Sequence, residues 1–313
     1  MKQLLRRAGV LALVLFLVYT LVFVVLVVLP GDPISNRLSD PDAGYTPQTV
    51  DLLKQYYGVD KPAALRYAEG LLRALHGDLG HSLADGQPVT GKLADAFAPT
   101  LELAGIALLI VLILTAVVGL GALYGRIPAL RVAFMSVPSL VYSLPVYLVA
   151  VVFIQAFSFQ LGWVPLNGDG GFAATFLPAC VLGITISPPL IQVFVRSLIN
   201  ADRLPHITVA RARGIPEFRI FTRHLLPGAA LPSLTVLGIT IGYLMSGAVV
   251  TETVFTRYGL GALTQKAVQQ HDQPVLLGIV VVNAAVFMLA NLLVDVVYPR
   301  FDPRVQPRFS HAR

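Results

Sequence analysis

One basic stretch between two apolar runs, residues 202–227, holds most of the side chains that could engage a charged partner. Besides Arg203, it contains four arginines that surround three very small residues: the arginines are Arg211, Arg213, Arg219 and Arg223, and the small residues are Ala210, Ala212 and Gly214. A stretch of this length is too short for a domain but long enough for one or two short helices. A partner surface could approach closely at the small residues, which favours docking over catalysis. The alternative is an ordinary basic loop held by anionic lipid headgroups.

A near match to a nucleotide-binding loop occurs at Gly86–Leu93, which reads GQPVTGKL. That motif requires Ser or Thr after the lysine, because the hydroxyl binds Mg²⁺, and Leu93 has none. We therefore predict no phosphate site here, so any ATP would bind to another chain. Cys180 is the only cysteine, which excludes an internal disulfide and argues against a cysteine-based metal site. We predict no metal and no cofactor in this chain.

Catalysis within a membrane would need a nucleophile and a base, or two carboxylates, within hydrogen-bonding reach. The apolar runs after the first contain Glu102, Glu252 and Asp295. We expect the first two near the outer face and the third near the inner face, with no histidine in mid-span. We therefore predict no catalytic residues. For Glu252 a structural role is favoured, because charge near the interface costs less than charge in mid-bilayer.

The composition is that of an integral membrane protein. The 313 residues are 56% hydrophobic and 13% charged, with a mean hydropathy of +0.73, whereas soluble domains carry roughly 25% charged residues. The net charge is +6. Its basic residues flank apolar runs, so the positive-inside bias of membrane proteins explains them better than nucleic-acid binding does.

Six apolar runs are long enough to cross a bilayer, which takes about 20 residues. They lie at about 8–29, 100–124, 132–157, 177–199, 229–254 and 275–298. The first is too long for a cleaved signal peptide, so we predict a retained anchor. Arginine and lysine gather at the N-terminus, in 125–131, in 200–227 and in the C-terminal tail, which places these four segments in the cytoplasm. The predicted fold is all-α, with six transmembrane helices and both termini cytoplasmic.

The predicted organisation has four parts. Residues 1–29 form the anchor helix, 30–99 an extracytoplasmic lobe, 100–298 a five-helix core with a basic cytoplasmic loop at 200–227, and 299–313 a cytoplasmic tail. The lobe lies between the first two spans. Its apolar spacing predicts two short amphipathic helices, the first starting at Thr46-Pro47.

The basic stretch resembles a known motif. Val209–Ile215 reads VARARGI and is similar to the TARAKGL form of the "EAA" coupling loop in permease subunits of dipeptide, oligopeptide and nickel ABC importers. Further matches run from end to end: Leu29–Pro33, Thr100–Leu103, Ser143–Pro145, Trp163–Pro165, His224–Pro232, Gly247–Phe255, His271–Val275, Asn291–Asp295 and Asp302–Arg304. This chain departs from the usual pattern at His206, often Tyr, and at Gly228, usually Asn.

The resemblance implies a non-catalytic permease in the bacterial inner membrane, crossing it several times. It implies coupling to an ATPase through Ala210, Arg211, Ala212, Arg213, Gly214 and Ile215. It also implies the partners: a second homologous permease, two cytoplasmic ATP-binding subunits that hold ATP and Mg²⁺, and an external solute-binding protein. The expected function is import of dipeptides or oligopeptides, and the alternative is import of nickel chelates or another small solute.

Prolines and small hydroxyl residues within the spans are the candidates for lining a pathway: Ser139, Tyr142, Ser143, Pro145, Ser187 and Ser246. Proline frees backbone carbonyls and kinks a helix, and such helices border water-filled cavities. The alternative is that the hydroxyls only satisfy the freed carbonyls. An ion-driven carrier is disfavoured because such folds show internal repeats and mid-membrane sites, which we do not find in the sequence.

Overall fold

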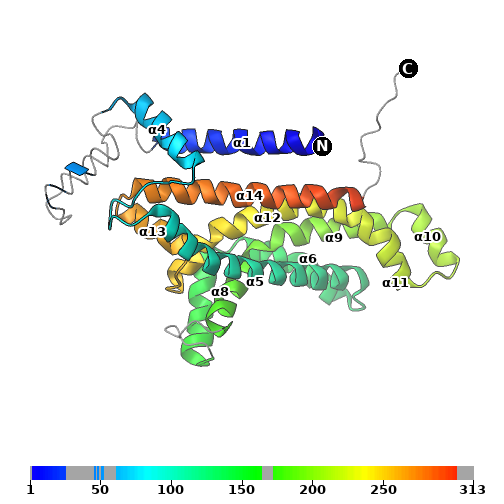
Figure 1. The fold of residues 1–313 in the computed structure, drawn as a ribbon. Coiled ribbons are helices and arrows are strands. Elements are labelled where there is room, and N and C mark those ends of the chain that lie inside the picture. Colours follow the sequence, from blue (N-terminus) through cyan, green and yellow to red (C-terminus); the bar gives the residue numbers. More distant parts are fainter. Residues whose placement is uncertain are drawn as a thin grey trace, which may run out of the picture. The chain divides into compact units, whose positions relative to one another are not determined.

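The computed structural model describes residues 2–25, 46, 48, 51–52, 61–163 and 172–301. Within these ranges the chain is helical, and the only β pairing is an isolated bridge between His81 and Pro88. The elements are α1 Lys2–Phe23, α4 Ala63–Leu75, α5 Val89–Tyr124, α6 Pro128–Tyr142, α7 Val146–Phe153, the π-helix η3 Ile154–Gln160, α8 Phe172–Ile186, α9 Pro188–Asp202, α10 Pro205–Ala212, α11 Glu217–Ile220, the π-helix η4 Phe221–Leu225, α12 Leu226–Val254, α13 Leu260–Gln269 and α14 Gln273–Phe301 (Figure 1).

Three helical segments are each long and apolar enough to cross a membrane: Val89–Tyr124, Glu217–Val254 and Gln273–Val294. They correspond to the second, fifth and sixth predicted spans. Two bent helix pairs also qualify if each pair counts as one span, which raises the number to five among the described residues. The first predicted span appears as a shorter apolar helix, Gly9–Phe23. The membrane orientation remains a prediction.

The third and fourth predicted spans are broken rather than straight. α6 and the α7–η3 helix meet at 104°, and Ala174–Ile186 meets α9 at 51°. Proline explains both breaks, because it has no backbone N–H to donate and its ring blocks the preceding turn. Pro145 is the N-cap of α7, and Pro188 stands in the first turn of α9.

The contacts divide the chain into two compact units. Residues 1–101 and 256–288 form the first unit, and residues 102–255 and 289–313 form the second. In the first unit α4 corresponds to the second predicted lobe helix, and most of the first predicted lobe helix falls outside the described residues. α4 contacts α1 through a hydrogen bond of 2.6 Å between Thr20 and Tyr67, beside an edge-on contact of the Phe23 and Tyr67 rings.

A buried polar cluster connects α13–α14 with the segment before α5, also in the first unit. The Asp272 carboxylate accepts hydrogen bonds from the Ser82 hydroxyl and from the backbone N–H of Leu83. All three residues are buried. Lys92 donates to the Ser82 hydroxyl as well. The cluster therefore satisfies a buried carboxylate that would otherwise destabilise the fold.

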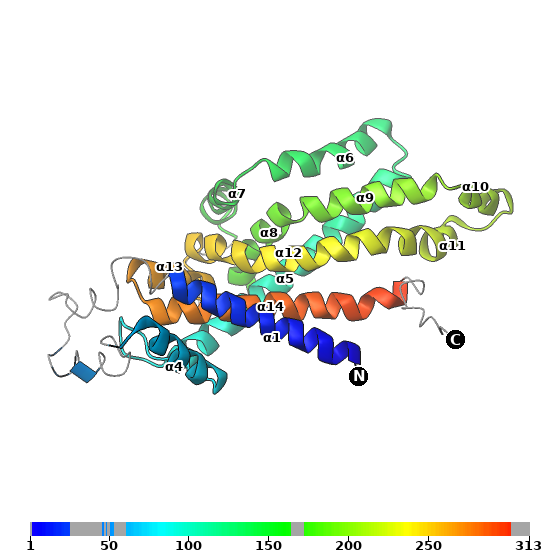
Figure 2. The same ribbon diagram turned by 90° about the horizontal axis from the view of Figure 1, so that it is seen from above.

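The second unit is built around α9 and α12, which pack along each other. α6 packs against α9, and Figure 2 shows the three helices side by side in the order α6, α9, α12. Close approach of α5 to α9 depends on Gly119, where an added Cβ would lie 2.6 Å from the Phe194 ring. This unit carries the coupling loop.

Candidate functional site

The coupling loop, residues 200–227, consists of short helices at one end of α9 and α12 (Figure 1). α9 ends at Asp202 and α10 begins at Pro205, where proline is favoured in a first helical turn because the N–H it lacks would be unpaired there. After a tight turn, α11 and η4 lead directly into α12. The prediction of one or two short helices in this stretch is met by α10 and α11.

Gly214 closes α10 in a Schellman motif. Its N–H donates to the Arg211 carbonyl at 2.9 Å, and the Ile215 N–H donates to the Ala210 carbonyl at 3.2 Å. This pattern requires a left-handed residue after the helix, and Gly214 has φ +73°. The glycine is therefore explained by the turn itself, in addition to any close approach by a partner.

Arg211 joins the parts of the coupling loop through two ion pairs. Its Nε lies 2.6 Å from a Glu217 carboxylate oxygen, and its Nη2 lies 2.5 Å from an Asp202 oxygen. The hydrogen bonds that it donates to Glu217 and then to Asp202 raise the pKa of the guanidinium. Arg211 therefore fastens the end of α9, α10 and α11 to one another.

The inner face of the coupling loop is apolar. Its buried side chains pack with Phe194 and Leu198 of α9 and Ala229 of α12 in one cluster; they are Ala201, Ile207, Ala210, Ile220 and Leu225. Ile215 packs on the same cluster. Ala210 thus points into the chain, whereas Ala212 and Gly214 are exposed.

The outer face carries cations and an exposed aromatic ring. Among the described residues, Arg213, Arg219 and Arg223 have no ion pair, and Phe218 is 79% exposed. Phe218 was not predicted from the sequence. The available signal was an aromatic residue between the charged residues Glu217 and Arg219. His206 packs edge-on against His224, with ring centroids 6.1 Å apart.

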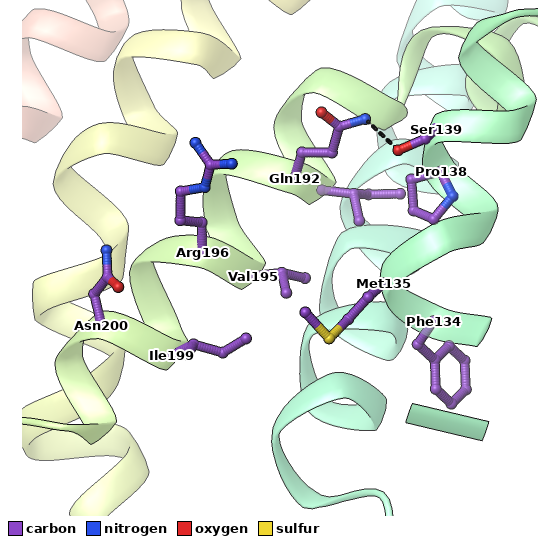
Figure 3. A pocket seen from close by; sticks show the side chains of 10 residues that line it. Phe134, Met135, Pro138, Ser139, Gln192, Val195, Arg196, Ile199 and Asn200 are labelled. Carbon is purple, nitrogen blue, oxygen red and sulfur yellow. Dashed lines mark hydrogen bonds between the residues drawn. The ribbon is translucent and has the colours of Figure 1, made fainter. Parts of the chain in front are cut away.

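A groove of about 310 Å³ lies between α6 and α9 in the same unit (Figure 3). Apolar and polar side chains of both helices line the groove: Phe134, Met135, Pro138 and Ser139 of α6, and Ile191, Gln192, Val195, Arg196, Ile199 and Asn200 of α9. The Gln192 side-chain nitrogen lies 3.4 Å from the Ser139 hydroxyl.

Comparison with known proteins assigns the chain to a family. The family described as binding-protein-dependent transport system inner membrane component matches residues 117–307. This chain belongs to that family. A putative peptide permease protein of Brucella suis is 33% identical over 297 residues, covering 91% of this chain and 93% of the relative. The glutathione transport system permease protein GsiC of Escherichia coli K12 is 30% identical over 292 residues, covering 93% and 94%.

A solved structure has the same fold. The crystal structure of an amino acid ABC transporter with histidines matches with a TM-score of 0.53 at 18% identity, covering 67% of this chain and 94% of that chain. The family match and the two permease relatives confirm the resemblance to permease subunits of peptide-type ABC importers. The chain is a permease subunit of the ABC importer type and an inner-membrane component.

The predicted pathway residues of the permease do not form one site. Ser139 lines the α6–α9 groove. Ser143 and Ser187 donate hydrogen bonds to the carbonyls of Leu140 and Ile184, at 2.7 and 3.0 Å. At helix breaks such hydroxyls satisfy backbone carbonyls, which is the alternative role considered for them from the sequence. The remaining three candidates, Tyr142, Pro145 and Ser246, are exposed.

The other sequence candidates are engaged in contacts within the permease. Lys92 of the near-match nucleotide loop donates to Asp85 at 2.5 Å. Glu102 accepts a hydrogen bond of 3.0 Å from Thr175. Glu252 is fully buried in α12, and the side chain of Asp295 falls outside the described residues. For Lys92, the neighbouring Asp85 carboxylate neutralises the ammonium and would repel a phosphate, which disfavours phosphate binding at this loop.

Proposed function

We propose that the permease forms half of the translocation pathway of an ATP-driven importer of peptides. A second homologous permease supplies the other half, and two cytoplasmic ATPase subunits, which carry ATP and Mg²⁺, dock on the two coupling loops. An external solute-binding protein delivers the cargo to the opposite face, where the 30–99 lobe helps to receive it. Peptide cargo is supported by the relatives, one named as a peptide permease and the other as a transporter of glutathione, itself a small peptide.

The attachment of the coupling loop to the membrane helices carries this proposal. The inner face of the loop packs with side chains of α9 and α12 in one buried cluster. Interiors of this kind are close-packed and transmit displacement rather than absorb it. A force on α10 and α11 therefore moves α9 and α12 directly.

The outer face of the coupling loop fits a protein partner. Exposed aromatic and arginine side chains are the residues enriched at interface centres. Phe218 supplies the ring, and Arg213 and Arg219 supply the charge. A lipid surface would accept the arginines as well, but docking in a protein groove also explains the exposed aromatic ring on α11.

Energy enters through differential binding. A ligand shifts a conformational equilibrium only by binding one state more tightly than the other. In the proposed importer, ATP favours the closed arrangement of the two ATPases, and the coupling loops convey that closure to the permeases. The permease itself performs no chemistry.

The experiment is cross-linking in the assembled complex. A single cysteine replaces Phe218 in a Cys180→Ser background, and the tagged permease is purified from native membranes with a short bifunctional cross-linker. The expected product joins the permease to a subunit with a nucleotide-binding motif. The control replaces Phe159 of η3, which is 67% exposed, and should not give that product. Recovery of the Phe218→Cys variant only as a monomer or attached to lipid would refute the docking role.

A further inference from the structure

One face of α9 presents three polar side chains within a bent membrane pair. Gln192, Arg196 and Asn200 follow at intervals of four residues, which places them on one side of a helix. They extend over about 12 Å at 1.5 Å per residue. Figure 3 shows them following one another along α9 at the α6–α9 groove, with Ser139 opposite Gln192.

The groove is positively charged. Arg196 has no ion pair or hydrogen bond among the described residues, and the residues that line the groove include no Asp or Glu. An arginine inside a membrane segment is costly, and such residues face a bundle interior or a water-filled cavity and pair with an opposite charge. The residues that line the groove provide no such charge.

Snorkelling toward the headgroups would explain Arg196 alone. It lies six residues before the end of α9 at Asp202, about 9 Å along the axis, and its long stem could reach the interface. Gln192 lies one turn further from that end, however, and its amide meets the Ser139 hydroxyl. An amide deep in the segment gains nothing from snorkelling, so the whole polar face is better explained by an aqueous route.

We propose that the α6–α9 groove is a station for cargo on the translocation pathway, in which Arg196 binds a carboxylate of the passing peptide. This inference rests on the proposed function. The amides of Gln192 and Asn200 bind the peptide groups, and Met135, Val195 and Ile199 contact apolar side chains. The volume of about 310 Å³ is at the lower end for small-molecule sites, which suits a dipeptide or tripeptide unit. A free carboxylate on the cargo supplies the opposite charge that Arg196 lacks.

The test uses the assembled importer, this permease with its native partner subunits, in lipid nanodiscs. Gln192→Cys in a Cys180→Ser background is treated with water-soluble thiosulfonates of either charge. We expect the anionic reagent to react several-fold faster than the cationic one, and Arg196→Gln to abolish that preference. Trialanine at millimolar concentration should slow the reaction, and trialanine amide should slow it much less. Leu140→Cys, exposed on α6 but outside the groove, is the control and should not respond to the peptide.

The alternative occupants give different results. A lipid-facing position reacts with neither water-soluble reagent. A contact with the second permease leaves the thiol of the Gln192→Cys variant unreactive in the complex but reactive in the isolated permease. Labelling that is insensitive to both trialanine and Arg196→Gln shows water without a cargo site. Each of these overturns the proposal.

Transport separates this inference from the proposed function. We expect Arg196→Gln to reduce peptide uptake into proteoliposomes about tenfold, the effect of losing one charge-assisted contact, and Arg196→Lys to retain most of it, with the ATPase subunits still bound. Uptake by the wild type with unchanged uptake by Arg196→Gln overturns the station alone. Absence of ATP-dependent peptide uptake in the wild type overturns the proposed function. If both variants lose the ATPase subunits, Arg196 supports assembly and the station is again rejected.

Discussion

The Arg211 guanidinium and the Glu217 carboxylate face each other across the turn at Gly214, with Nε and Oε1 2.6 Å apart. The same guanidinium binds Asp202 at the end of α9. The Arg211 side chain therefore joins three helices of the coupling loop: the end of α9, its own helix α10, and α11. Arg211 belongs to the motif predicted to contact the ATPase, but its guanidinium already forms ion pairs within the permease.

Loss of Arg211 should loosen the coupling loop without unfolding the permease. Its pairs are one-quarter to one-half exposed, and such surface ion pairs contribute up to about 1 kcal/mol each. We expect Arg211→Met to raise hydrogen exchange of the amides in 203–217 several-fold and to leave that of α12 unchanged. The control is Arg213→Met, which removes a charge that has no ion pair among the described residues. Equal exchange in the two variants would contradict the role given to Arg211.

Gly214→Ala should destabilise the coupling loop through the backbone alone. A Cβ there would meet nothing within 4 Å, but φ +73° is left-handed and costs an L-residue about 1–2 kcal/mol. Gly214→Asn should cost less, because Asn tolerates this conformation. The measurement is again hydrogen exchange of 205–217, with Gly228→Ala as the control, since its Cβ would make ordinary contact with Ala201 at 3.6 Å. A larger effect of the control would reject the explanation.

Apolar run length located the long straight helices but not the geometry of the broken ones. α5, α12 and α14 correspond to predicted spans. A helix needs about 20 apolar residues to cross the bilayer, and the length of an apolar run measures this directly. The 104° bend before Val146 was not predicted. Hydropathy averages side chains over a window and ignores the backbone, so Pro145 signalled a kink without its angle.

The coupling loop was located by its motif, but the side on which each residue lies was not. Ala210 was expected at the surface and is buried, because α10 packs its Ile207–Ala210 face on α9 and α12. The spacing of three residues between these two was the available signal. The ion pair of Arg211 with Glu217 depends on the turn at Gly214 and cannot be read from periodicity. The α6–α9 groove joins segments more than 50 residues apart, such as Ser139 and Gln192, and needed the fold.

Gly119→Ala should weaken the packing of α5 on α9. The new Cβ would lie 2.6 Å from the Phe194 ring, and overpacking of a well-packed core typically costs about 1–3 kcal/mol. We expect a lower midpoint of thermal unfolding in detergent, and partial rescue when Phe194→Leu is combined with it. Gly105→Ala on the same helix is the matched control, because nothing lies within 4 Å of its Cβ. No rescue by the double variant would show that the two sites are not coupled.

The ion pair of Lys92 with Asp85 should make the first unit sensitive to acid. Partial burial alone would raise the pKa of Asp85, but hydrogen bonds from the Lys92 side chain and the Gln87 N–H outweigh it, so the pKa lies below the usual value of 3.8. A carboxyl whose pKa is lowered by folding stabilises the protein above its unfolded pKa, and this contribution is lost as the pH falls through the folded pKa. We expect Asp85→Asn to lower the midpoint of thermal unfolding at pH 7, and the difference from the wild type to close as the pH falls below 3.8. In a Lys92→Met background the same substitution should have a smaller effect at pH 7, because the ammonium is gone and the hydrogen bond from the Gln87 N–H remains. A gap between Asp85→Asn and wild type that persists at the lowest pH would assign the loss to packing instead of charge.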